Sequence, residues 1–238
     1  MFHNLQKYYG KKIGATDGDI GHVKDFYFDD KTWSIRYLVV DTGSWLGGRE
    51  VLLPPHVFAP TALAISNSDN RVLPANLTRQ QIESSPSVDS HRLVSRQFEA
   101  EYHRYYGWPV YWQDSAARSG ASAPVVVPPP EGSAAQHAPP RHDDIHLRST
   151  KAVTGYHIQA TDGRVGSVRG FMVHDRSWTI RELVVETGPW YAGKIVLILP
   201  EDITRVSYED SSVLVNLSKK VIEQTTRDDV AQAEAGHH

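Results

Sequence analysis

Four aspartates, which form two pairs with the same spacing, are the first residues in this sequence that could act in catalysis. Asp17 and Asp162 stand in the same tetrapeptide, Ala-Thr-Asp-Gly, and Asp30 and Asp175 follow them at equal spacing. Two carboxylates can act as general acid and base or nucleophile when they converge on one cleft at a set separation. All four stand beside turn signals, where aspartate is favoured for hydrogen bonds to nearby backbone. We therefore expect turn residues here and no catalytic site.

Metal and nucleotide sites are also not indicated. The chain has 12 histidines and no cysteine, and its closest histidine groups are His137/His142/His146 and His237-His238. Neither group has the paired spacing of a metal motif on an expected helix. The glycines that follow Asp17 and Asp162 lack phosphate-loop spacing and precede expected strands, not helices. We expect no metal or cofactor, and we interpret one set of residues as structural turns: Asp17, Gly18, Gly21, Asp162, Gly163 and Gly166.

Aromatic residues in loops are the candidate interaction residues. Trp45 and Trp190, the latter followed by Tyr191, lie between glycines. Each tryptophan is either a lid over its own domain or an exposed anchor, since tryptophan and tyrosine are enriched at binding hot spots. Trp108 and Trp112 end an aromatic run and either pack within the chain or bind a partner. Protein binding is the function that we favour.

Cations near these rings leave RNA binding as the alternative. Basic side chains interleaved with aromatic rings can bind single-stranded RNA. The candidates are Arg36, Arg49, Arg169, Arg181 and Lys194. The net charge is −3 and the isoelectric point about 6.4, so an extended basic face is not expected. Arg36 and Arg181 have a second interpretation, pairing with local carboxylates.

A long internal repeat determines how these residues are positioned. Residues 15–58 match residues 160–203 at an offset of 145, and the two segments have identical residues at tryptophan, glycine and Leu-Val-Val positions. Further along, the offset becomes 140, where Asn76-Leu77-Thr78 meets Asn216-Leu217-Ser218. A long unit that occurs twice indicates a duplicated domain and not a solenoid.

Each copy is expected to be a small antiparallel β-barrel. Runs of β-branched and aromatic residues alternate with turn dipeptides about every ten residues. Thr78-Arg-Gln-Gln is typical of a capping box for a short closing helix. The expected strands are 23–28, 33–40, 51–53, 62–65 and 71–73 in the first copy, and 178–185, 195–199, 205–208 and 212–215 in the second.

The rest of the chain connects or follows the copies. The period of Phe98, Tyr102 and Tyr105 predicts a helix over 95–106. The next segment is rich in Ala, Ser, Gly and Pro, which predicts a flexible linker. The expected organisation is barrel 1 at 8–86, an aromatic helix-loop connector at 87–114, the linker at 115–146, barrel 2 at 147–226 and a tail at 227–238.

The repeated motif resembles the PRC-barrel domain family. The resembling core is Asp-Gly-x-x-Gly-x-Val-x-x-Phe, then Trp-x-Ile-Arg-x-Leu-Val-Val-(Asp/Glu)-Thr-Gly-x-Trp, then Gly-(Arg/Lys)-x-Val-Leu, at 17–52 and 162–197. This fold occurs in the photosynthetic reaction-centre H subunit and in a ribosome maturation factor. The H subunit has a membrane helix and the ribosome factor has one barrel beside another domain, so neither specific role carries over.

The resemblance implies a non-enzymatic adaptor of two barrels. By resemblance its partner is a reaction-centre-type or other membrane electron-transport assembly, and a ribosome-associated role is the alternative. A contact between the two barrels, or between two copies of the chain, is a further expectation. No signal peptide or membrane span is expected, because the longest apolar runs, 195–199 and 123–127, are far below the ~20 residues that a span needs. We expect a cytoplasmic protein.

Overall fold

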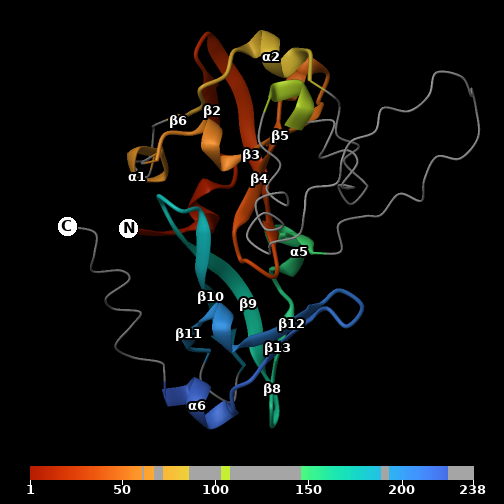
Figure 1. Cartoon of the computed structure of the whole chain (residues 1–238). Coiled ribbons are helices and arrows are strands. Elements are labelled where there is room, and N and C mark those ends of the chain that lie inside the picture. The colour runs from red at the N-terminus through yellow and green to blue at the C-terminus, as the bar shows by residue number, and fades with distance from the viewer. Residues whose placement is uncertain (61, 67–71, 86–102, 108–145, 189–192, 225–238) are drawn as a thin grey trace, which may run out of the picture.

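A computed structural model of the chain describes residues 1–60, 62–66, 72–85, 103–107, 146–188 and 193–224. The protein is mainly β, as expected, with two separate sheets and a few short helices (Figure 1). We call the residues up to 85 the N-terminal domain and those from 146 the C-terminal domain. The expected linker, the tail and most of the expected helix over 95–106 lie outside the described residues.

The N-terminal domain contains most of the first sheet, in the order β5-β4-β3-β2-β6. Its strands are β2 (Lys12–Ala15), β3 (Gly18–Asp29), β4 (Ile35–Asp41), β5 (Glu50–Leu53) and β6 (Leu73–Pro74). Short 3-10 helices are η1 (Leu5–Tyr8), η2 (Gly43–Leu46) and η3 (Pro55–Val57), and the α-helices are α1 (Ala62–Ser66) and α2 (Arg79–Glu83). The capping box expected at Thr78 is present at the start of α2.

The C-terminal domain repeats this plan in the order β11-β10-β9-β8-β13-β12. Its strands are β8 (His157–Ala160), β9 (Gly163–His174), β10 (Thr179–Thr187), β11 (Ile195–Ile198), β12 (Ile203–Ser207) and β13 (Ser212–Val215). The helices are α5 (Thr150–Val153), η5 (Pro200–Asp202) and α6 (Lys219–Gln224). In each domain one strand pair is parallel, β2 with β6 and β8 with β13, so both sheets are mixed and not purely antiparallel.

One expected strand is wrong. Residues 62–65 lie in the helix α1, whereas the matching stretch of the second copy forms β12. Alanine and leucine favour helix, and Ala62 and Leu63 are buried. The two copies therefore diverge where their offset changes from 145 to 140.

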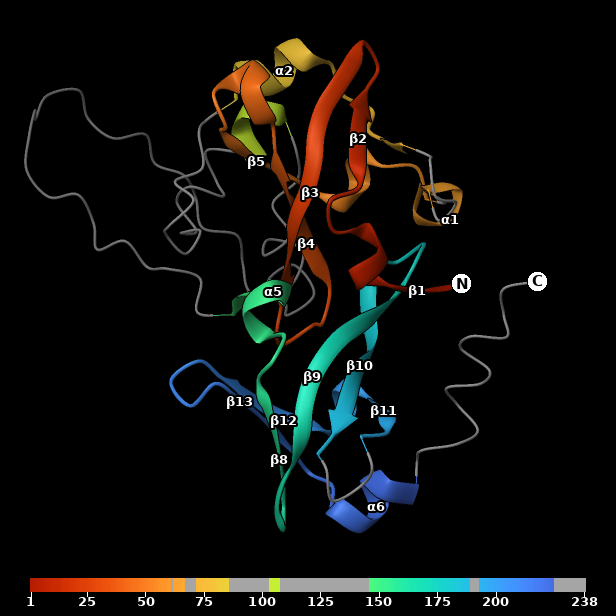
Figure 2. The same cartoon turned by 180° about the vertical axis from the view of Figure 1, so that it is seen from behind.

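Two short strands cross from one domain to the other sheet. β1 (Phe2–Asn4) pairs with β9, and β7 (Leu147–Ser149) pairs with β3. These exchanges are equivalent, because β1 and β7, like β3 and β9, are related by the offset of 145. In both views the two domains stack end to end, with α5, which directly follows β7, near the junction between them; Figure 2 also labels β1 there (Figures 1 and 2).

The junction has an approximate twofold axis at Ser34 and Thr179, which form a bridge with each other and are themselves related by the offset. On either side, Ile35 N–H donates to the Trp178 carbonyl and Ile180 N–H to the Trp33 carbonyl. Both tryptophans are buried at positive φ, 56° and 51°, which a bulky residue rarely adopts. This backbone ends each hairpin turn, so the strand expected from Trp33 starts at Ile35.

The junction is also the centre of the hydrophobic core. Phe28 stacks on Trp33 with ring centroids 5.4 Å apart and meets Phe171 of the other domain at 5.6 Å. Phe58 lies 5.7 Å from Trp178. A single cluster of buried side chains contains residues of both domains. The fold is therefore two repeated sheets around one shared core.

Candidate functional site

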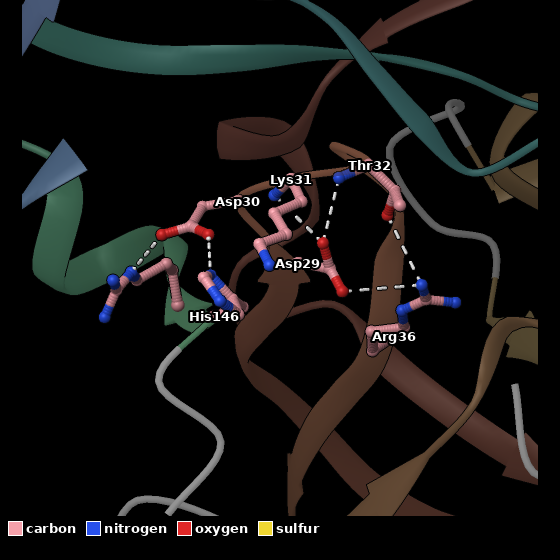
Figure 3. Close-up of polar contacts among 7 residues, drawn as sticks. Asp29, Asp30, Lys31, Thr32, Arg36 and His146 are labelled. Atoms are coloured by element: carbon pink, nitrogen blue, oxygen red, sulfur yellow. Dashed lines mark hydrogen bonds and ion pairs between the residues drawn. The ribbon is translucent and has the colours of Figure 1, made fainter. Parts of the chain in front are cut away.

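Asp30 joins the domains. Its carboxylate accepts from His146 Nδ1 at 2.9 Å and from Arg148 Nε at 2.6 Å (Figure 3). The neighbouring Asp29 faces the other way: it accepts from the backbone of the hairpin turn and pairs with Arg36 at 3.5 Å. Asp30 therefore links the two domains, and Asp29 stabilises the hairpin turn.

Asp175 occupies the equivalent place in the other domain. It accepts from the N-terminal amine of Met1 at 3.0 Å and lies 3.9 Å from His3. Met1 and His3 are the offset equivalents of His146 and Arg148. Burial raises the pKa of Asp175, but the N-terminal charge, His174 and His3 together hold it below its usual value. Asp30 and Asp175 thus anchor the two exchanged strands.

Asp25 contacts three consecutive residues of the C-terminal domain. The nearly buried carboxylate accepts from Ser149 Oγ, from Thr150 Oγ1 at 3.0 Å and from Lys151 N–H at 3.1 Å, besides its own neighbour Phe26 N–H at 2.7 Å. Its counterpart by the offset is Gly170, beside which the side chains of Asn4 and Gln6 lie. The β3–β7 and β9–β1 contacts therefore have the same backbone pairing but different side-chain interactions.

The titration of Asp25 gives a prediction for stability. Burial raises the pKa of Asp25, and the four hydrogen bonds to Ser149, Lys151, Phe26 and Thr150 oppose that rise. A carboxyl with a raised folded-state pKa stabilises the fold fully below its unfolded pKa, and this contribution is lost as pH rises through the folded pKa. We expect the stability of wild type relative to Asp25→Asn to fall as pH rises from the acid range toward neutrality. Urea unfolding of both proteins across this range measures it; a difference independent of pH contradicts it.

Asp17 and Asp162 cap helices. Asp17 Oδ1 accepts from Arg79 N–H at 2.8 Å, at the start of α2, and Asp162 Oδ1 accepts from Lys219 N–H at 2.9 Å, at the start of α6. Helix termini leave N–H groups that such oxygens satisfy. None of the four matched aspartates meets its repeat counterpart in a shared cleft, since each contacts the structural partner named above.

Trp45 covers the end of its own domain. Its indole N–H donates to the Ile20 carbonyl, the Arg79 guanidinium lies 4.3 Å from its ring centroid, and the half-buried side chain packs against the core. Of the two interpretations left open, the lid describes these contacts. Trp108, Trp112, Trp190 and Tyr191 lie outside the described residues, and their interaction role stays a prediction.

We expect Trp45→Ala to lower the free energy of unfolding by about 1–3 kcal/mol, because it removes a buried ring face, a hydrogen bond and a cation–π contact. Trp45→Phe keeps a ring under Arg79 and loses the indole donor, so its loss is expected to be smaller. Chemical denaturation followed by circular dichroism measures both. Unchanged stability in Trp45→Ala would show that the ring is not a lid.

Several cations considered for RNA binding are engaged within the molecule. Arg49 donates to the carbonyls of Ile82, Glu83 and Ser85 at the end of α2. Arg36 pairs with Asp29, as anticipated, and Arg169 pairs with Glu186. These contacts hold the three guanidinium groups within the molecule.

The described ranges contain no group of three or more His, Asp or Glu side chains arranged to hold a metal ion. His146 contacts Asp30, whereas His137, His142, His237 and His238 lie outside those ranges. Within the same part of the chain, helices long and apolar enough to span a membrane are absent.

Sequence reasoning missed the segment that precedes the repeat motif. The interdomain contacts of Asn4, Ser149 and Thr150 come from residues that share little identity between the copies. Extending the offset of 145 backwards would have shown that this segment belongs to the repeat, since Gly10 matches Gly155 and Ile13 matches Ile158. Both glycines have positive φ, 75° and 93°, two residues after the ends of η1 and α5.

Comparison with known families identifies the N-terminal domain. Residues 3–77 match the family model of the PRC-barrel domain, which assigns the first domain and not the second. A search of curated proteins found no match to the chain.

Proposed function

Since residues 3–77 are a PRC-barrel domain and the C-terminal domain repeats their strand plan, we propose that this protein is a non-enzymatic adaptor. It binds a larger protein assembly and holds the surfaces of its two barrels at a fixed relative position. Its partner contacts include the loop of Trp190 and Tyr191.

The reciprocal strand exchange is the observation that carries this proposal. The carboxylates best suited to catalysis by residue type are Asp25, Asp30 and Asp175. All three instead accept hydrogen bonds that join β1 and β7 to the opposite sheets. An enzyme needs such groups aimed at a substrate, whereas a scaffold needs them between its parts. The shared core then makes the two domains a single body, which suits a protein whose role is to position partners.

Affinity capture from the protein's own host tests the proposal. Wild type is compared with Trp190→Ala/Tyr191→Ala, with membrane, ribosomal and soluble fractions analysed separately by mass spectrometry. We expect a defined set of proteins that wild type enriches and the double variant loses while its circular dichroism spectrum is unchanged. An identical set from both proteins removes the loop assignment, and no enrichment in any fraction rejects the adaptor.

The RNA-associated alternative predicts a different result in the same experiment. Enrichment of ribosomal proteins that disappears after nuclease treatment or at high salt would favour it, because phosphate contacts weaken steeply with salt. The intramolecular engagement of Arg36, Arg49 and Arg169 argues for the protein partner instead.

A further inference from the structure

The β3–β7 contact is built around one carboxylate. Asp25 of β3 accepts from the side chains of Ser149 and Thr150 and from Lys151 N–H. Asp25 and Thr150 are both buried, so neither can exchange its partner for water. A buried carboxylate is tolerated only where donors surround it. The segment that joins β7 to α5 supplies these donors.

The β9–β1 contact has Gly170 in the place of Asp25. A Cβ atom at Gly170 would lie 3.2 Å from Asn4 Oδ1 and 3.4 Å from Gln6 Cγ and Cδ. The Asn4 oxygen is fixed there, because it caps η1 by accepting from Gln6 N–H at 3.0 Å. An aspartate opposite this segment would press its carboxylate against a carbonyl oxygen and two carbon atoms. The segment that joins β1 to η1 therefore requires glycine.

We propose that Asp25 and Gly170 make the junction selective for one N-terminal and one C-terminal domain and reject homotypic pairing, the pairing of two domains of the same kind. The backbone permits both, because the domains are related by an approximate twofold axis with Ser34 and Thr179 at its centre. Homotypic pairing leaves the other domain of each copy open to a further copy, which produces open-ended assemblies. The selectivity keeps the chain closed on itself, and it does not depend on the adaptor function.

Two N-terminal domains would mismatch at the carboxylate. The register would place Asp25 of each copy against β1 and η1 of the other. There Leu5 stands in the place of Thr150 and offers no hydroxyl, and Leu5 is fully buried. Gln6 N–H, in the place of Lys151 N–H, already donates to its own cap. The buried carboxylate would thus lose its donors, which is strongly unfavourable.

Two C-terminal domains would mismatch for the opposite reason. Ser149 and Thr150 of each copy would face Gly170 of the other, where no carboxylate accepts from them. The space that the Asp25 side chain fills would also be empty, and unfilled space in a packed junction is destabilising. Only the pairing of unlike domains satisfies both contacts.

Single cysteines on the axis report which domains pair. The chain contains no cysteine, so a thiol introduced by Ser34→Cys meets its counterpart in another copy only where two N-terminal domains pair. Thr179→Cys reports two C-terminal domains in the same way. Opposed residues of an antiparallel bridge have Cα atoms about 4.5–5.5 Å apart, within reach of a disulfide. Copies that merely swap whole domains still set Ser34 opposite Thr179 and stay unlinked.

Refolding from urea in oxidising buffer, followed by electrophoresis without reductant, tests the proposal. Asp25→Gly is expected to raise the covalent dimer yield of Ser34→Cys at least threefold and to leave that of Thr179→Cys unchanged. Gly170→Asp is expected to do the reverse, because each substitution gives a domain the residue that its own exchanged strand accepts. A substitution that fails to raise its own reporter, or raises both reporters alike, overturns the proposal.

A double-mutant cycle tests the same match within one chain. Ser149→Asn keeps a capping side chain for α5, as Asn4 provides for η1, but removes the hydroxyl from which Asp25 accepts. We expect Ser149→Asn to raise the unfolding constant about tenfold in wild type and less than threefold in Asp25→Gly. Equal increases in both backgrounds contradict the match. Failure of this proposal leaves the adaptor standing, because the adaptor is judged by the partner capture described above.

Discussion

Gly166→Ala is expected to lower the free energy of unfolding by about 3 kcal/mol or more. A Cβ atom at this position would lie 2.0 Å from the Glu186 carbonyl oxygen and 2.8 Å from the Thr187 Cα. Both atoms belong to the backbone of β10, so neither can move aside without breaking the pairing of β9 with β10. Urea denaturation followed by circular dichroism gives the loss.

The repeat supplies a replicate and the C-terminal domain a control. A Cβ atom at Gly21 would lie equally close to the Asp41 carbonyl oxygen, at 2.0 Å, so Gly21→Ala is expected to be similarly destabilising. A Cβ at Gly188 would meet only the Val165 carbonyl oxygen at 3.4 Å, an ordinary contact. Gly188→Ala should stay within about 0.5 kcal/mol of wild type. Equal stability of Gly166→Ala and Gly188→Ala would contradict the close approach.

Phe28→Ala should cost about 3–5 kcal/mol and weaken both domains together. The fully buried ring touches Trp33 in its own domain and Phe171 in the other. Because the core is shared, opening it exposes apolar surface on both sides of the junction. Hydrogen exchange of β5 and β11, one strand in each domain, reports the two sides separately.

The hydrogen-exchange measurement distinguishes one core shared by both domains from two independent cores. We expect protection in β5 and β11 to fall by the same factor in Phe28→Ala. Val72→Ala, which removes an exposed side chain, is expected to change neither. Loss of protection in β5 alone would show that the domains unfold independently.

The contact between the two hairpin turns at the junction also accounts for the two buried tryptophans at positive φ. Trp33 and Trp178 point their carbonyls across the axis, each to an N–H of the other domain. Such a backbone costs of order 1 kcal/mol per residue, which burial of a large ring at the junction offsets. The matched tryptophans of the repeat are thus explained by the joint between the copies and not by either domain alone.

Local patterns in the sequence were enough for the duplication, the mainly β class, the turns at Asp17 and Asp162, the capping box and most strands, because turn chemistry and β-branched runs act over a few residues. Residues 62–65 failed, since a run of four apolar residues fits a strand or a helix and packing decides between them.

Only the tertiary structure decided which strand joins which sheet. β1 and β7 are three residues long, too short for a periodic signal, and their partners are far away in the sequence. The roles of Asp25, Asp30 and Asp175 follow from that pairing. A sequence pattern records which side chains can be buried, but the contacts that bury them form between segments that only the folded chain brings together.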